Sequence, residues 1–326
     1  MRVRFFQPAA LTTAFLALLV SRASAQSSWE SAIHGNPEDV VTPVQAGYVL
    51  MGGGRDVDEA IQWLIQRAGR GDVVVLRASG TAAYNPYMVS LGADSAETII
   101  FRDREASSDP LVLQKIRLAE AIWIAGGDQW NYIRLWKDTP LQQALQEHID
   151  AGRPLGGTSA GLAVLGEFFF SARHDSVRSE EAGLDPYHPR VTVETGFLRI
   201  PNLQKLITDS HFSERDRMVR TLAFLARIQK DFDVISVRAV GLDEQTAIVV
   251  DGEGAARVVG RNRASLLRTT RLAEQCEPAR PLRLDDVEFW SLGPGDEFRL
   301  NATDFGPQAP PKRLAVDGLQ VLITEP

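Results

Sequence analysis

The sequence predicts an α/β protein: a three-layer α/β/α arrangement around a mostly parallel sheet, followed by a β-rich C-terminal extension. Three observations predict this class. Short apolar runs rich in β-branched residues alternate with segments of helical spacing, glycine-rich turns follow several of these runs, and past Gly241 short strands are separated by turn residues. Alternating strands and helices favour a parallel sheet covered on both faces. Ligands of such sheets bind beyond the carboxyl ends of the strands, where these glycine-rich turns fall.

Each element is predicted from its local pattern. The apolar runs expected to form strands are 47–51, 72–76, 97–101, 121–125, 247–250 and 256–259. Apolar residues at helical spacing predict helices over 56–68, 111–119 and 141–151, and Gly152 and Pro154 stop the last of these. Residues 306–312, with three prolines, are expected to form a loop. We predict three segments: a signal peptide (1–25), an α/β/α domain (26–265) and a β-rich extension (266–326).

The first residues resemble an export signal. Arg2 and Arg4 precede an apolar run over 9–20, and Ala23-Ser24-Ala25 is the small-residue pattern that signal peptidase cleaves. The alternative, an uncleaved membrane anchor, is less favoured because the run is shorter than the ~20 residues that span a bilayer. The predicted location is therefore secreted, periplasmic or extracellular, with no membrane association after cleavage.

Composition excludes several classes of protein. The 326 residues carry a formal net charge of −7, which argues against a nucleic-acid surface. Cys276 is the single cysteine, so no intramolecular disulfide can form, and the acids around it disfavour a thiolate. No H-E-x-x-H motif or cysteine cluster occurs, so neither a metal nor another cofactor is expected. A homodimer is among the assemblies that the sequence leaves open.

A candidate nucleophile lies in the segment Gly157-Thr158-Ser159-Ala160-Gly161. It fits the nucleophile-elbow pattern G-x-S-x-G, between a strand-like segment and a helix expected to begin near Leu162. Small residues suit this motif because the serine occupies a strained turn that exposes its hydroxyl. The alternative interpretation is a structural glycine turn.

Two other glycine-rich loops follow predicted strands. In Ala125-Gly126-Gly127-Asp128-Gln129, the amide of Gly127 could lie beside that of Ala160 and form an oxyanion hole, or the loop could be only a turn capped by Asp128. The triplet Gly52-Gly53-Gly54 lacks the third spaced glycine of a dinucleotide site and the G-K-[ST] of a phosphate loop.

A serine nucleophile needs a base, and there are five histidines. We expect His148 on a solvated helix face and three others in polar segments: His34, His174 and His188. His211 differs, because it follows an apolar stretch (203–207) and precedes Ser213-Glu214-Arg215-Asp216, which resembles the start of a helix. His211 is thus the candidate base, with a structural histidine as the alternative.

Charged residues surround this candidate. Arg215, Arg217 and Arg220 follow on the predicted helix, where the spacings Glu214/Arg217 and Asp216/Arg220 suit surface ion pairs; an anionic substrate or partner is the alternative. Asp243 and Glu244 are predicted to enter a strand. Adjacent strand residues face opposite ways, so only one of these two can orient His211, and the sequence does not decide which.

Taken together, these segments resemble the serine peptidase family that contains cyanophycinase and aspartyl dipeptidase, whose fold is related to class I glutamine amidotransferases. The matching pieces, in the family's order within residues 48–250, are Ala125-Gly126-Gly127-Asp128-Gln129, Gly157-Thr158-Ser159-Ala160-Gly161, Asp209-Ser210-His211-Phe212 with Arg215, Arg217 and Arg220, and Gly241-Leu242-Asp243-Glu244 with Thr246-Ala247.

The resemblance implies a secreted serine peptidase that cleaves aspartyl or β-aspartyl bonds, cyanophycin among the candidates, in a peptide or polypeptide partner. It implies that Ser159 is the nucleophile, His211 the base and Glu244 the orienting acid. The same resemblance implies that four residues bind the substrate: Gln129, Asp209, Arg215 and Arg217. The sequence departs from the family at Ser210, where glutamine usually precedes the histidine.

Two other functions compete with this one. A secreted α/β-hydrolase esterase would share the elbow, but its histidine should follow the acid, and no histidine follows His211. A non-catalytic binding protein on an amidotransferase-like scaffold would have lost the serine or its base, whereas both are present. A true amidotransferase would need a cysteine in place of Ser159.

Overall fold

The computed structural model describes residues 27–301 and 304–325. The predicted signal peptide therefore lies outside the described residues. Across those residues, we find no helix that combines the length and the apolar character needed to cross a bilayer.

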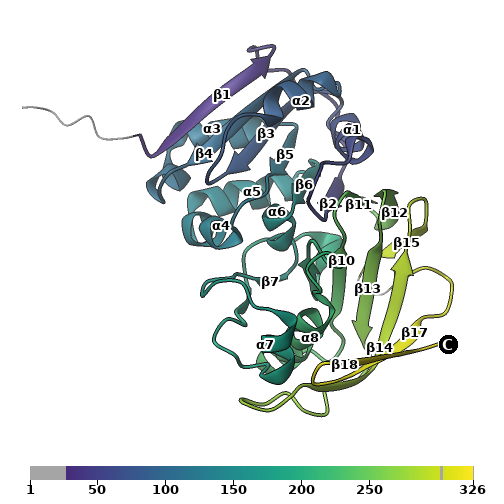
Figure 1. Cartoon of the computed structure of the whole chain (residues 1–326). Coiled ribbons are helices and arrows are strands. Elements are labelled where there is room, and N and C mark those ends of the chain that lie inside the picture. The colour runs from purple at the N-terminus through teal and green to yellow at the C-terminus, as the bar shows by residue number, and fades with distance from the viewer. Residues whose placement is uncertain (1–26, 302–303, 326) are drawn as a thin grey trace, which may run out of the picture.

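The strands form two sheets; the parallel strands of the first lie in the upper half of Figure 1, and its last strands lie beside the second sheet on the right. The first has ten strands in the order β1 (Trp29–Gly35), β4 (Ser95–Phe101), β3 (Asp72–Arg77), β5 (Ala121–Ile124), β6 (Leu155–Thr158), β2 (Gly47–Met51), β11 (Thr246–Asp251), β12 (Ala255–Gly260), β15 (Glu297–Leu300) and β16 (Phe305–Gly306). Its centre, from β4 to β2, is parallel, and β1 and β11 flank that centre as antiparallel neighbours.

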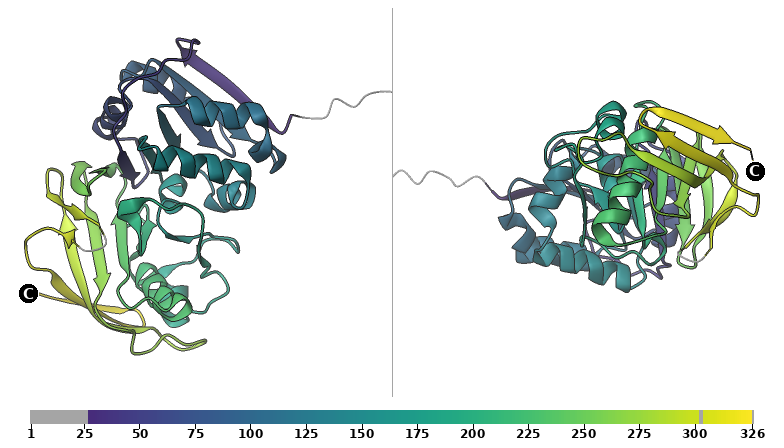
Figure 2. Two further views of the ribbon diagram at one scale, coloured as in Figure 1. Left: turned by 180° about the vertical axis from the view of Figure 1, so that it is seen from behind. Right: turned by 90° about the horizontal axis from the view of Figure 1, so that it is seen from below.

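Helices cover both faces of the parallel centre, as the two views of Figure 2 show. One face packs against α1 (Asp58–Arg67) and α2 (Tyr84–Ser90). The other packs against α3 (Pro110–Leu118), α4 (Gln129–Trp136) and α5 (Pro140–Asp150). The central strands are buried on both faces, which is why they appear in the sequence as continuous apolar runs.

The second sheet has eight strands in the order β18 (Gln320–Thr324), β17 (Lys312–Asp317), β14 (Arg283–Leu292), β13 (Ala264–Thr269), β10 (Arg238–Leu242), β9 (Leu206–Asp209), β7 (Phe168–Phe170) and β8 (Val193–Thr195). It packs with α7 (Ser179–Leu184) and the amphipathic α8 (Met218–Phe232) around a separate apolar core. Two short 3₁₀ turns, Glu105–Ser108 and Pro201–Leu203, complete the elements.

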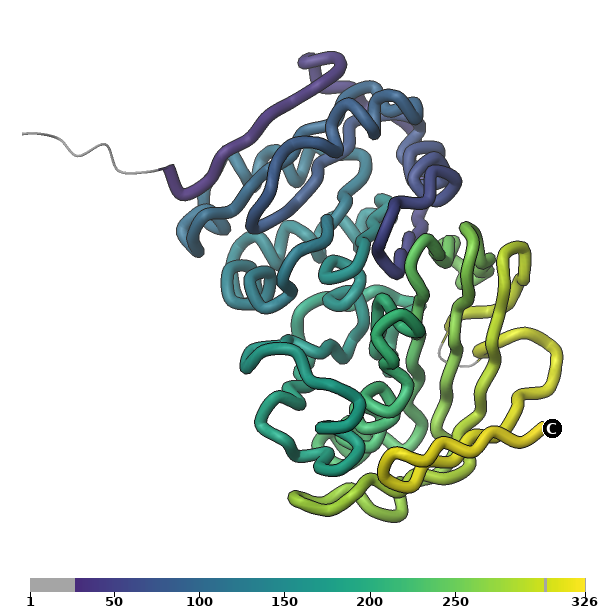
Figure 3. Tube along the Cα trace, in the orientation of Figure 1, coloured from purple at the N-terminus to yellow at the C-terminus, as the bar shows by residue number. Residues whose placement is uncertain are grey.

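The predicted fold class is confirmed, including the β-rich C-terminal region. The second sheet adds a feature that the sequence did not predict, because strands from the middle of the chain and from its end pair within it (Figure 3). β13 begins at Ala264 and so runs across position 265/266. The division of the chain into domains at that position stays a prediction.

The two sheets meet where the chain crosses between them. β6 of the first sheet leads through the single-turn helix α6 (Ala160–Ala163) to β7 of the second. β10 of the second sheet leads through the turn 243–245 to β11 of the first. Both crossings lie at the carboxyl end of the parallel strands, because Thr158 at the end of β6 and Ala247 at the start of β11 both pair with Met51, the last residue of β2. The predicted ligand-binding edge is therefore also the junction between the sheets.

Candidate active site

Ser159 occupies a strained turn between β6 and α6. Its backbone torsions, φ 54° and ψ −113°, are ones that a non-glycine residue rarely adopts. Glycine is needed on both sides, because a β-carbon on Gly157 would lie 2.7 Å from the Gly161 backbone and one on Gly161 would lie 2.1 Å from the Ile124 carbonyl oxygen. This close packing holds the serine at the tip of the turn, as in a nucleophile elbow.

The structure brings Ser159, His211 and Glu244 together from three separate segments. The Oγ of Ser159 lies 2.8 Å from Nε2 of His211, and Nδ1 of His211 lies 2.6 Å from Oε1 of Glu244. With the imidazole proton on Nδ1, that nitrogen donates to the carboxylate and Nε2 accepts from the serine hydroxyl. The side chain of His211 is 9% exposed and that of Glu244 is 34% exposed, so solvent reaches mainly the acid.

The surroundings of His211 keep it neutral. Burial, the largest influence, lowers the pKa of His211 below its ordinary value, and Arg215 and Arg217 lower it further, while Glu244 opposes them. A base must be unprotonated to accept a proton from serine. The site is therefore arranged to hold the imidazole in its reactive form at neutral pH.

The choice between the two neighbouring acids is resolved by the geometry. Asp243 and Glu244 lie in the turn between β10 and β11, not at the start of a strand as predicted. Glu244 contacts His211, whereas the Asp243 carboxylate accepts from the backbone amides of Ser213 and Arg263 at 2.9 and 3.2 Å. The prediction that only one of them meets the histidine therefore holds, although a turn separates them and not strand alternation.

The glycine triplet after β2 connects the three segments of this site. Ser159 donates its amide to the Met51 carbonyl, and His211 donates to that of Gly52. A β-carbon on Gly53 would lie 2.5 Å from Cε1 of the His211 ring, and one on Gly54 would lie 2.9 Å from the Glu244 side chain. No chemical role was predicted for this triplet. In the structure, it lets the backbone pack directly against the histidine and the acid.

A cavity of about 330 Å³ opens beside the serine. Gly127 and Ala160, the predicted oxyanion-hole residues, both line it, and so does Gln129, whose side-chain amide donates to the Phe170 carbonyl at 3.3 Å. The loop at Gly126 lies beside the serine, since a β-carbon there would be in ordinary contact with Cβ of Ser159, at 3.5 Å.

A buried ion cluster forms one wall of this cavity. Asp209 is 4% exposed and accepts from Arg220 through both carboxylate oxygens, at 2.5 and 2.8 Å, and from Nη1 of Arg217 at 3.2 Å. Burial alone would raise the pKa of Asp209, but Arg220 and Arg217 hold it below its ordinary value. Asp209 thus holds the arginines in place, and its own oxygens are already occupied by protein donors.

The region after His211 differs from the prediction in two ways. α8 begins at Met218 and its first residues have no side-chain cap, so the predicted helix start at Ser213 is wrong. The two surface ion pairs predicted by spacing are replaced by the bonds from Arg217 and Arg220 to Asp209, 8 and 11 residues away, because a buried carboxylate holds both guanidinium groups. Of the three arginines after His211, only Arg215 is exposed, and it lines the cavity.

Two other residues named in the sequence lie away from the site. His148 is 3% exposed, so the prediction of a solvated helix face is wrong; its Nε2 lies 3.0 Å from the Pro154 carbonyl, because the side chain faces the sheet. Cys276 is buried, and burial raises the pKa of its thiol to about 11. In the part of the chain that the structure describes, no group of acidic, histidine and cysteine side chains suits a metal ion.

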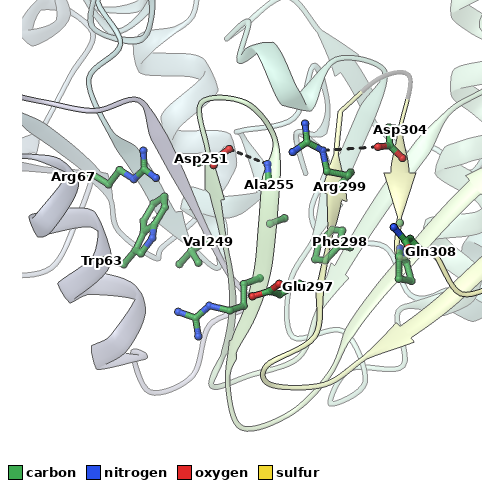
Figure 4. Close-up of a pocket in the computed structure, with 14 residues that line it drawn as sticks. Trp63, Arg67, Val249, Asp251, Ala255, Glu297, Phe298, Arg299, Asp304 and Gln308 are labelled. Atoms are coloured by element: carbon green, nitrogen blue, oxygen red, sulfur yellow. Dashed lines mark hydrogen bonds and ion pairs between the residues drawn. The ribbon is translucent and has the colours of Figure 1, made fainter.

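A larger cavity, of about 760 Å³, lies between α1 and the end of the first sheet that β11, β12, β15 and β16 form (Figure 4). Three of its charged groups have partners within the cavity: Asp251 accepts from the Ala255 amide at 2.9 Å, and Arg299 lies 3.8 Å from Asp304. None of its lining residues belongs to the Ser159 site. The smaller cavity beside Ser159 is therefore the one that carries catalytic groups.

The α/β/α fold and a serine, histidine and carboxylate in contact define the class of a serine hydrolase. Comparison with known proteins identifies the family: residues 81–258, more than half of the chain, match peptidase family S51, and the chain belongs to this family. It is thus a serine-type peptidase.

The chain is similar to several proteins named cyanophycinase. It is 28% identical over 215 residues to the cyanophycinase of Trichormus variabilis, covering 64% of this chain and 67% of the relative. It is 26% identical over 297 residues to the cyanophycinase of Thermosynechococcus vestitus, covering 83% and 87%. Among solved structures, a peptidase from an acI-B1 Actinobacterium matches with a TM-score of 0.52 and 20% identity, over 79% of this chain and 98% of that one, which supports the fold alone.

Proposed function

We propose that this chain is an exported, cyanophycinase-like peptidase that cleaves an amide beside an aspartyl or β-aspartyl carboxylate through an acyl-enzyme on Ser159. The single observation that carries the proposal is the contact of Ser159 Oγ with His211 Nε2 at 2.8 Å, with His211 held in turn by Glu244 at 2.6 Å.

In the proposed reaction, Ser159 attacks the amide carbonyl while His211 takes its proton. Glu244 holds the imidazole in the tautomer that can accept this proton and stabilises the imidazolium that forms. The oxyanion is bound by the amides of Gly127 and Ala160, each worth about 3–4 kcal/mol of transition-state stabilisation. His211 then gives its proton to the leaving amine, and water activated by the same histidine hydrolyses the acyl-enzyme.

The proposed preference for a substrate with an aspartyl carboxylate rests on the charged residues that line the Ser159 cavity. Four arginines line it, Arg173, Arg215, Arg217 and Arg220, against three aspartates, Asp128, Asp175 and Asp209. Arg217 uses Nη1 for its hydrogen bonds to Asp209 and to the Ser210 carbonyl, at 3.2 and 2.7 Å, and its Nε and Nη2 have no partner among the described residues. A guanidinium with free donors suits a carboxylate, which it can bind with two charge-assisted hydrogen bonds.

Ser210 contacts the arginine that we expect to bind the substrate carboxylate. It occupies the position where the family usually has glutamine, and its hydroxyl and carbonyl both accept from Arg217, at 3.2 and 2.7 Å. A serine is shorter than a glutamine, so we expect it to orient Arg217 and not to reach the substrate itself. The carboxylate selectivity then depends on Arg217 and Arg215 more than on this position.

The test is a matched substrate panel with purified mature protein. We expect a β-aspartyl or α-aspartyl dipeptide to be cut at least about tenfold faster, in kcat/KM, than its asparaginyl or alanyl counterpart, since loss of a charge-assisted hydrogen bond costs about 1.5–3 kcal/mol. Arg217→Lys should reduce that ratio, because lysine cannot form the bidentate contact. Equal rates for neutral and acidic peptides would remove the specificity, and faster cleavage of simple esters than of any peptide would favour the esterase alternative.

Export is tested separately. The charged start, apolar run and Ala23-Ser24-Ala25 support a mature chain that begins at Gln26 outside the cytoplasm. Sequencing the amino terminus of protein recovered from the periplasm or medium of an expressing bacterium checks this. An intact Met1 on the recovered protein would contradict it.

A further inference from the structure

The turn that carries Glu244 is bonded directly to the segment that carries His211. Residues 210–217, with the histidine, follow β9, and residues 243–245 join β10 to β11, which are labelled one above the other on the right of Figure 1. β9 and β10 pair in parallel along the whole of β9. Past the end of β9 this strand pairing stops, and a different set of hydrogen bonds takes its place.

Three hydrogen bonds join residues 212–214 to residues 242–244. They are, in order, the Phe212 amide to the Leu242 carbonyl at 3.0 Å, the Ser213 amide to the Asp243 carboxylate at 2.9 Å, and the Glu244 amide to the Glu214 carboxylate at 3.0 Å. Side-chain oxygens thus replace backbone carbonyls as acceptors in two of the three bonds. In the last bond, the segment that bears the base holds the backbone of its own acid.

The carbonyl side of Glu244 is held by other residues. Nδ2 of Asn262 donates to the Glu244 carbonyl at 2.8 Å, and the hydroxyl of Thr246 donates to it at 3.2 Å. The next residue, Gln245, has a left-handed backbone, with φ 55°. The carbonyl therefore has two partners, whereas Glu214 is the one partner of the Glu244 amide in the described part of the chain.

Packing alone does not fix the side chain of Glu244. It is 34% exposed, and it lies against Gly54, which has no side chain to hold it. Its contact with Nδ1 of His211, at 2.6 Å, therefore depends on where the backbone of the turn places it. Such placement matters for the rate, because a misplacement of 1 Å in an active site can lower a rate about 100-fold.

Glu214 has no other contact that would explain its position. Its side chain is exposed and is absent from the lining of the Ser159 cavity, which its neighbour Arg215 does line. Across the described residues, its carboxylate forms no ion pair and accepts only from the Glu244 amide. The contact with the acid of the active site is thus its single structural role.

We propose that Glu214 is a positioning residue: its carboxylate oxygen holds the backbone of Glu244 so that the acid reaches His211. This rests on the proposed function, because it requires His211 to activate Ser159. It also deepens that function, since the pairing of base and acid then depends on a hydrogen-bond acceptor at position 214 and not on the charge of that acceptor.

The rate at which a serine-directed phosphonate labels Ser159 tests this, because it reports activation of the serine without a choice of substrate. Glu214→Ala removes the acceptor, and we expect labelling to be about tenfold slower, less than the loss for a full 1 Å misplacement. Glu214→Gln removes the same charge but keeps an acceptor oxygen, so its rate should stay within about twofold of the wild type. Glu297→Ala, the same change at an exposed glutamate of β15, is the control and should label like the wild type.

Two further readouts separate positioning from a loss of stability. In a Glu244→Ala background there is no acid to position, so adding Glu214→Ala should slow labelling by less than about twofold. The second readout is the pH profile. Burial, Arg215 and Arg217 lower the pKa of His211 and Glu244 opposes them, so a weaker contact with Glu244 should move the acid limb of the labelling rate to lower pH in Glu214→Ala.

The outcomes are distinct. A wild-type rate in folded Glu214→Ala, an equal loss in Glu214→Gln, or a full tenfold further loss in the Glu244→Ala background would each overturn the role of Glu214. Circular dichroism checks that the variants are folded. If instead the phosphonate left Ser159 of the wild-type protein unlabelled, the proposed function itself would fail, whatever the variants at position 214 showed.

Discussion

A buried histidine lies near each end of β6, and the two histidines have different surroundings. At the amino end, His148 is 3% exposed and contacts only the Pro154 carbonyl, at 3.0 Å; its Nδ1 has no partner among the described residues. At the carboxyl end, His211 is 7% exposed and lies between a hydroxyl and a carboxylate. Burial is similar, so burial alone does not make a histidine catalytic.

The partners and the backbone make the difference. Burial lowers the pKa of His148 to about 4, whereas Glu244 opposes the effect of burial on His211. His211 also has a left-handed backbone, with φ 43°, at the end of β9, while His148 lies within the regular helix α5. Strain and a matched acid thus mark the reactive histidine.

Replacing the two histidines should change the catalytic rate by very different amounts. His211→Ala should lower kcat/KM by about 10⁴-fold or more, because serine loses its base, whereas His148→Gln should stay within about threefold of the wild type. Steady-state kinetics on the best substrate measures this, with circular dichroism as the check on folding. Comparable losses in the two folded variants would contradict the contrast.

The two neighbouring acids should differ nearly as much. Glu244→Gln should reduce kcat by about 10³-fold or more, because the neutral amide cannot stabilise the imidazolium, and Asp243→Asn by less than about tenfold. Asp243 binds backbone amides of Ser213 and Arg263, so its loss should appear first as a lower denaturation midpoint. A reversed order in kcat, with both proteins folded, would take Glu244 out of the site.

A methyl group placed against the ring of His211 should act on catalysis without replacing a catalytic side chain. Gly53→Ala would place a β-carbon 2.5 Å from the ring, and we expect a fall in kcat of about 10- to 100-fold as the ring shifts. Gly152→Ala is the matched control, because both glycines have positive φ, 106° and 69°, but the nearest atom to the new β-carbon at Gly152 is 3.9 Å away. The left-handed backbone should cost Gly152→Ala about 1–2 kcal/mol of stability, and Gly53→Ala should lose more, because its new β-carbon also meets the ring. Equal activities in the two variants would show that the glycine contact does not position the histidine.

The smallest effect concerns stability in acid. The folded-state pKa of His148 is lowered to about 4, below the ~6.5 of an unfolded histidine, so its contribution is fully present above pH 6.5 and is lost as the pH falls through 4. The shift corresponds to about 3 kcal/mol at most. Urea unfolding at pH 7 and pH 4 should therefore show a smaller acid loss for His148→Gln than for the wild type. The same loss in both would mean that His148 is not the group that titrates.

Local patterns predicted the parts of the site that local geometry determines. The elbow around Ser159 was predictable because a strained turn demands small residues at fixed positions. His211 was predictable from the apolar stretch before it, which leads into β9, although the helix start expected just after it was wrong. The apolar runs predicted the central strands because both of their faces are buried.

The remaining features depend on contacts between distant segments. The role of Gly53 requires β2 to lie beside β6 and His211 to arrive from another sheet, and a single sequence does not give that register. The burial of Arg217 and Arg220 is set by Asp209, 8 and 11 residues away, so helix spacing suggested the wrong partners. The prediction for His148 was wrong for a related reason: its charged neighbours in sequence face solvent, while its own side chain faces the sheet.

The most direct test of the account is labelling with a serine-directed phosphonate, followed by mass spectrometry of the peptides. The account predicts one phosphonate on Ser159, none in Ser159→Ala, and a labelling rate that falls in acid with an apparent pKa below the ordinary ~6.5, because neutral His211 must take the proton. His211→Ala should be labelled slowly at every pH. Labelling of another residue with Ser159 unmodified, or equal rates in the wild type and His211→Ala, would contradict the central claim that His211 activates Ser159.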